Sequence, residues 1–168
     1  LSMVLVWNAV VLVARADPVN LTRGAISVSK SIKAHAQLVA AFTIVVIFTG
    51  TVVTASGPHG GDEHVERLNF SFPEVARIHG AAVIVLVVLT SSLMFRVRRT
   101  NADGFRRRVL ILLVITLSQA AIGYTQYFTK LPVLLVAFHI AGATLLWIAT
   151  VRLLLSSQTG FPKVGLHE

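Results

Sequence analysis

Two histidines stand inside long apolar stretches, where an ionisable side chain is costly. His79 lies in "VARIHGAAVIVLVVL" and His139 in "VLLVAFHIAGATLLW", and small residues follow each of them. A histidine within a membrane-spanning helix usually faces the interior of a bundle or a cavity. Two neutral imidazoles on opposite sides of a planar metal complex would complete a six-coordinate haem iron, for which axial histidine is a standard ligand. The pair therefore predicts a haem site with His79 and His139 as the axial ligands of the iron.

Neighbours of the two histidines suit the same site. Gly80 and Gly142 lack side chains, so a flat macrocycle could approach the helix backbone beside each histidine. Arg77 could pair with a haem propionate, but an arginine whose charge reaches the membrane interface explains this position equally well. The alternative for the histidines is a hydrogen bond across helices, with the small residues serving helix packing.

Further polar residues complete the list of candidates. Gln119, Gly123 and Tyr127 are spaced by four residues and predict one stripe of a helix that faces the bundle, for packing or for cofactor contact. Outside the apolar stretches, His59 and His64 flank "GGDE". They could form a loose metal site, but a solvated loop is the simpler interpretation. We interpret the remaining histidines, His35 and His167, as incidental.

The elements that must position these residues are long apolar helices. The chain has 168 residues, of which 55% are hydrophobic and 13% charged, whereas soluble domains carry about 25% charge. Apolar stretches cover residues 37–55, 75–95, 109–128 and 132–155, and each is near or above the roughly 18 to 20 residues that cross a bilayer as a helix. The expected fold is all-α and integral to the membrane, as an up-and-down bundle of four transmembrane helices.

The expected boundaries follow from the same stretches. Residues 1–14 are apolar but too short to span the bilayer, and we interpret them as the C-terminal part of a preceding transmembrane helix. A cytoplasmic connector is expected at 15–36, the haem-binding bundle at 37–155 and a cytoplasmic tail at 156–168. Within the bundle, the helices are expected to start near Gln37, after Pro73 and after Arg108, with Pro132 in the first turn of the last.

Charge predicts how the helices cross the membrane. The formal net charge is +8, and the basic residues concentrate in 15–36 and in "RVRRTNADGFRRR" at 96–108. By the positive-inside rule these connectors are cytoplasmic, and 56–74 and 128–132 lie outside a cell membrane. Membrane topology explains the charge without nucleic acid. The chain has no cysteine, so neither disulfides nor thiolate ligands are available.

Three segments together resemble the C-terminal half of haem A synthase, the membrane enzyme that completes the haem of cytochrome c oxidases. They are "GTVVTASGPHGGD" at 50–62, "VARIHGAAV" at 75–83 and "QAAIGYTQYFTKLPVLLVAFHIAGATLLW" at 119–147. The resemblance covers roughly residues 37–155. It implies an oxidoreductase of eight helices in two similar halves, each with a histidine pair on its second and fourth helices. In the C-terminal half this pair, here His79 and His139, holds a haem b that passes electrons.

The resemblance also implies the reaction and its partners. Such an enzyme oxidises the C8 methyl of haem O to a formyl group, with haem O bound in the N-terminal half, where the catalytic residues are expected. Haem O synthase and an electron donor such as a quinol would be partners, and the visible chain would begin just past the second histidine of the N-terminal half. Many members carry cysteine pairs in outer loops, which this chain lacks.

Two other functions stay open from the sequence. One is a free-standing four-helix b-type cytochrome, including a homo-oligomer of it, that acts as an electron-transfer module. The other is a haem-free transporter or assembly factor.

Overall fold

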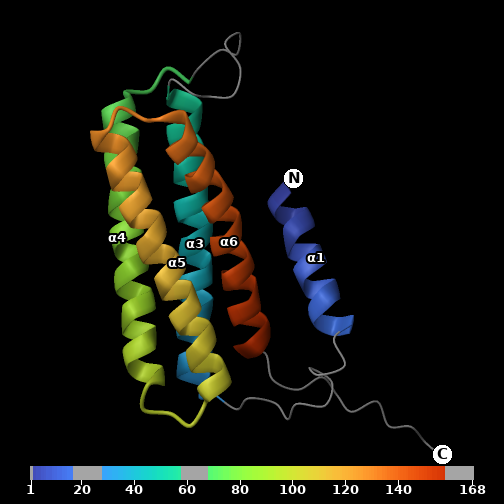
Figure 1. The fold of residues 1–168 in the computed structure, drawn as a ribbon. Coiled ribbons are helices and arrows are strands. Elements are labelled where there is room, and N and C mark those ends of the chain that lie inside the picture. Colours follow the sequence, from blue (N-terminus) through green and yellow to red (C-terminus); the bar gives the residue numbers. More distant parts are fainter. Residues whose placement is uncertain (1, 17–27, 58–67, 158–168) are drawn as a thin grey trace, which may run out of the picture.

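The computed structural model describes residues 2–16, 28–57 and 68–157, and 88% of these residues are helical, with no strand among them. The helices are α1 (Ser2–Ala16), α3 (Lys30–Ser56), α4 (Phe72–Val97), α5 (Asp103–Phe128) and α6 (Val133–Ser157). Figure 1 shows α3 to α6 side by side as a bundle, with α1 beside α6. The expected all-α fold with four long apolar helices is therefore confirmed.

The connections alternate between the two ends of the bundle. The end of α3, the start of α4 and the turn from α5 to α6 lie at one end, and the link from α4 to α5 lies at the other (Figure 1). The most extensive packing is between α3 and α4 and between α5 and α6. The bundle thus consists of two antiparallel hairpins, as the short turn before Pro132 predicts.

Two helices begin earlier than hydropathy predicts. α3 starts at Lys30 and not near Gln37, because the Ser29 side chain caps it by accepting a hydrogen bond from the Ile32 amide at 3.3 Å. α5 starts at Asp103, not after Arg108, and an Asp103–Arg106 ion pair of 2.8 Å lies in its first turn. The expected connector 15–36 is therefore too long, since an apolar stretch marks the lipid-facing length of a helix and not its ends.

The other two helices begin close to their expected positions. Pro73 lies in the first turn of α4 together with Glu74, whose carboxylate suits the positive end of the helix dipole. α6 begins at Val133, so Pro132 immediately precedes the helix and its carbonyl accepts from the Val136 amide at 3.1 Å. The tight turn between α5 and α6 has left-handed backbone at Lys130 and Leu131.

The four helices of the bundle share one polar feature, a buried threonine that bonds within its own helix. Each of the four helices buries one threonine, and its hydroxyl donates to the carbonyl four residues earlier at 2.8 to 2.9 Å: Thr43, Thr90, Thr116 and Thr150. These hydroxyls need no partner on another helix. Around them the core is apolar, with Val39, Leu86, Leu93, Phe105 and Leu112 fully buried.

The outer surface of the bundle is apolar, as a lipid-facing surface must be. The four helices contain 25 to 27 residues, so each is about 38 to 40 Å long and can cross a hydrocarbon core of about 30 Å. Large side chains on all four helices are exposed, among them Phe48, Val88, Val114 and Leu145. α1 packs on α6, with the Trp7 and Trp147 ring centres 5.9 Å apart.

Candidate functional site

A large cavity opens between the helices in the half of the bundle that carries the α3–α4 connection. Its volume is about 900 Å³, and α3, α4, α5 and α6 all contribute lining residues. The wall is mainly apolar, and its polar side chains include His79, His139, Gln119, Gln126 and Arg77. Cavities of about 300 to 1,000 Å³ with a few convergent polar groups are typical ligand sites.

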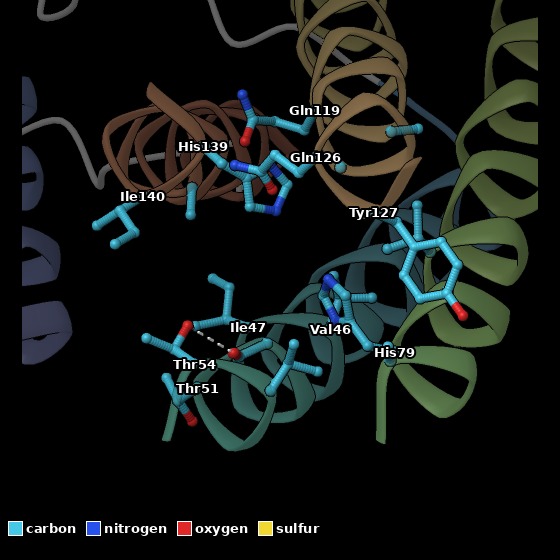
Figure 2. A pocket seen from close by; sticks show the side chains of 18 of the residues that line it. Val46, Ile47, Thr51, Thr54, His79, Gln119, Gln126, Tyr127, His139 and Ile140 are labelled. Atoms are coloured by element: carbon cyan, nitrogen blue, oxygen red, sulfur yellow. Dashed lines mark hydrogen bonds between the residues drawn. The ribbon is translucent and has the colours of Figure 1, made fainter. Parts of the chain in front are cut away.

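His79 on α4 and His139 on α6 face each other across this cavity. Their ring centres are 6.5 Å apart and their planes are nearly perpendicular, at 89°. Figure 2 shows both imidazoles directed into the space between the helices. Both side chains are partly buried. The expectation that alternate helices bring these two rings together is therefore confirmed.

The His79 ring is held by α3. Its Nδ1 lies 3.1 Å from the Thr49 hydroxyl. That hydroxyl also lies 3.0 Å from the carbonyl oxygens of both Val45 and Val46, to which it donates. The His79 ring thus has the Thr49 hydroxyl as a partner on the neighbouring helix, and the Val46 backbone of that helix is also within its hydrogen-bond reach.

A glycine packs against each histidine ring. A Cβ added to Gly50 on α3 would lie 3.1 Å from Cε1 of His79, and one added to Gly123 on α5 would lie 3.3 Å from Cε1 of His139. Both distances are tighter than ordinary contacts, so even alanine would press on the imidazole. In each hairpin, the first helix therefore supplies a glycine that makes room for the histidine on the second.

The His139 side of the cavity is polar and incompletely satisfied. Among the described residues, three buried side-chain atoms have no hydrogen-bond partner: Gln119 Oε1, Gln126 Nε2 and His139 Nδ1. Gln126 is only 6% exposed. Figure 2 shows both glutamines beside His139. Buried polar atoms without partners are uncommon and indicate a place for water or ligand.

The remaining predicted site residues also lie at or beside the cavity. Gly80 and Arg77 line it, and a Cβ on Gly80 would meet nothing within 4 Å. Gly142 does not line the cavity: the Gln119 amide occupies the space where its Cβ would be. Of the predicted stripe, Gln119 and Gly123 line the wall, and Tyr127 does so with 45% of its surface exposed.

Three residues of the site were not predicted from the sequence: Thr49, Gly50 and Gln126. The only signal for Gln126 was its spacing of seven residues from Gln119, which returns to the same helix face after nearly two turns. Nothing in the sequence separates Thr49 from Thr51 and Thr54 nearby. Which threonine meets His79 depends on how α3 rotates against α4.

His35, interpreted from sequence as incidental, makes contacts between helices. Its Nε2 lies 3.1 Å from the Leu89 carbonyl and its Nδ1 lies 3.1 Å from an Arg96 nitrogen, while Arg96 also donates to Ser31 at 2.8 Å. The cluster joins α3 and α4 at the end away from the cavity, so its role is structural.

The loose metal site expected around His59 and His64 lies outside the described residues, and so does His167, which we interpret as incidental. Among residues 2–16, 28–57 and 68–157, no three histidine, cysteine or carboxylate side chains group into a metal site. The facing pair of imidazoles is thus the metal-binding candidate in this part of the chain.

No protein-family model, curated protein or solved structure matches this chain. The site must therefore be interpreted from its own geometry.

Proposed function

We propose that the bundle binds haem b between His79 and His139 and passes electrons through it. The observation that carries this proposal is the facing pair of imidazoles across a large, mainly apolar cavity. A porphyrin supplies four nitrogens to its iron, so the protein needs to add only two axial ligands. A pair of histidines without a third ligand suits that need better than it suits zinc, which takes three or four protein ligands.

The separation of the rings fits an iron between them. A metal–imidazole bond is about 2 Å long and the ring centre lies about 1.2 Å beyond the nitrogen, so two axial ligands in line have centres about 6.4 Å apart. The observed distance is 6.5 Å. A direct hydrogen bond of about 3 Å in line would bring the centres to about 5.4 Å. The perpendicular planes are no obstacle, because each ligand can rotate about its bond to the metal.

The chain's own residues would bind and shield the cofactor. Haem b, when bound, supplies one-electron transfer. The apolar wall, which includes Val83, Leu86 and Leu146, excludes water. Arg77 has its guanidinium available to a propionate at the cavity edge. Gly80 leaves open space beside His79 for the flat face of a macrocycle.

The sequence resemblance supports a narrower proposal. The chain would be the C-terminal half of a haem A synthase, an oxidoreductase that converts the C8 methyl of haem O to a formyl group for cytochrome oxidase assembly. This half would relay electrons from a donor such as a quinol to a catalytic half that binds haem O and receives it from haem O synthase. In this proposal the catalytic residues belong to the other half, and the bundle contributes the relay site.

One observation favours a second candidate, a free-standing b-type cytochrome. All of the described residues that line the cavity lie between Val46 and Leu146, and none belongs to α1. Within the described segments, α3 to α6 with their connections supply every lining residue, so in this candidate these four helices bind the haem. The two candidates share the haem site and differ in whether haem O is turned over.

Absorption spectroscopy tests the shared site. Protein purified in detergent after expression with sufficient haem should show a Soret band and the sharp α and β bands of reduced low-spin haem b. Pyridine extraction should give about one haem b per chain. A protein that folds as a helical bundle but takes up no haem, even on titration with hemin, would refute the proposal.

The orientation in the cell membrane is part of the proposal, and labelling tests it. The described basic residues concentrate at one end of the bundle, near the starts of α3 and α5 and the end of α4: Lys30, Lys33, Arg96, Arg98, Arg99, Arg106, Arg107 and Arg108. By the positive-inside rule this end is cytoplasmic, and 56–74 and 128–132 are outside.

Because the chain has no cysteine, single-cysteine variants give a clean answer. We expect an impermeant maleimide to label Asn69→Cys, but not Asn101→Cys, in intact cells; both positions are exposed. Labelling of Asn101→Cys alone would reverse the orientation. Equal labelling of both before lysis would contradict a membrane crossing by α4.

A further inference from the structure

The contacts of the Thr49 hydroxyl indicate which ring nitrogen of His79 carries the proton. A hydroxyl group has one hydrogen to donate and can accept through its lone pairs. The carbonyl oxygens of Val45 and Val46 both lie 3.0 Å from the Thr49 oxygen, and either can accept its hydrogen. With its hydrogen on a carbonyl, the same oxygen accepts from His79, whose Nδ1 lies 3.1 Å away. In this arrangement Nδ1 of His79 carries the hydrogen, and the lone pair of a neutral imidazole is on Nε2.

We propose that Thr49 is the positioning residue of His79 in the haem site. It holds the ring as the Nδ1–H tautomer, orients it toward the cavity and strengthens Nε2 as a ligand through the N–H···O bond. The next residue, Gly50, has no side chain to push the ring away from this contact. This inference rests on the proposed haem site, but the tautomer itself is a property of the protein without haem.

The two histidines differ in the hydrogen-bond partner of Nδ1. His139 Nδ1 is buried and has no partner within the described segments, in contrast to His79. The position of Thr49 is also specific, because Thr54 on the same helix lines the cavity but donates to the Gly50 carbonyl at 3.1 Å. The effect of Thr49 should therefore act through His79 alone.

The hydrogen bond should affect the midpoint potential of the bound haem. A histidine that donates its second N–H is a more basic ligand and favours the more highly charged ferric state. Without the bond, the preference for the ferric state should fall. Loss of an outer hydrogen-bond partner typically lowers metal affinity or activity by about 10- to 100-fold. For a one-electron couple, a tenfold change in the equilibrium constant corresponds to about 59 mV.

The first experiment uses the haem-free protein with ¹⁵N-labelled histidine in detergent micelles, at about pH 8, where histidine is ordinarily neutral. We expect the ¹⁵N shifts of His79, assigned with His79→Gln, to report the Nδ1–H tautomer. Thr49→Val should shift the ring toward Nε2–H, while Thr49→Ser should retain the wild-type tautomer. Thr43→Val is the matched control, because Thr43 lies on the same helix, donates to the Val39 carbonyl and does not line the cavity. It should change nothing at His79. Nε2–H in the wild type would overturn the inference.

The second experiment uses the haem-loaded protein and measures the midpoint potential by spectroscopic titration. Thr49→Val should raise it by about 59 mV, a tenfold loss of ferric preference, and Thr49→Ser should restore it. Thr43→Val, which does not change the cavity wall, should leave it within error of the wild type. An unchanged potential in Thr49→Val would overturn the inference although haem binds. If the wild type binds no haem, the proposed function fails and the NMR result alone decides the role of Thr49.

Discussion

Substitution of either His79 or His139 by alanine should remove the low-spin haem b spectrum. The two rings lie 6.5 Å apart on different helices, and each would supply one of two axial bonds. With one ring gone, the iron would be five-coordinate and high-spin, or the haem would be lost. We expect haem affinity to fall by more than about 100-fold, beyond the loss typical for an outer hydrogen-bond partner. Absorption spectra of the reduced protein, with hemin titration, measure both effects.

Two controls separate ligand loss from misfolding. His35→Ala removes an imidazole at the far end of the bundle, where His35 contacts Leu89 and Arg96, and should leave the spectrum unchanged. Added imidazole should restore a low-spin spectrum to His79→Gly, because the small molecule fits where the side chain was. The spectrum of His79→Ala is the decisive result: if it matches the wild type, His79 is not a ligand.

Hydropathy and loop length were enough to predict the hairpins and the facing histidines. Both signals are local: an apolar stretch of sufficient length must be a helix in lipid, and a very short turn must join antiparallel neighbours. Given two antiparallel hairpins, the depth of a histidine follows from its distance to the helix end at about 1.5 Å per residue. His79 and His139 could therefore be paired by their positions in the sequence alone.

The sequence could not predict how the helices rotate about their own axes or at which residues their polar ends begin. Thr49, Thr51 and Thr54 lie close together in α3, but only Thr49 contacts the His79 ring. Hydropathy also missed the starts of α3 and α5, because polar turns beyond the hydrocarbon are stabilised by caps and ion pairs. The predicted stripe included Tyr127 and not Gln126. At 3.6 residues per turn, however, Gln126 at seven residues from Gln119 lies closer to the same helix face than Tyr127 at eight.

The shape of the cavity leads to the second large prediction, at Gly80. A Cβ added to Gly80 would meet nothing within 4 Å beyond its own helix backbone and its chain neighbours, and Gly80 lines the cavity beside His79. Leucine in place of glycine also favours the helix by roughly 0.8 kcal/mol or more. We therefore expect Gly80→Leu to leave the haem-free bundle as stable as the wild type, while its side chain occupies the space proposed for the macrocycle.

Haem binding and stability should consequently separate in Gly80→Leu. We expect loss of the low-spin spectrum and more than about 10-fold weaker binding of hemin, a loss of over about 1.4 kcal/mol, with no decrease in the thermal midpoint of the haem-free protein. Ala137→Leu is the matched control, because Ala137 lies on α6 near His139, is exposed and does not line the cavity. It should bind haem normally. Full haem binding by Gly80→Leu would show that the cofactor does not lie against this face of α4, and the cavity between the histidines would need another occupant.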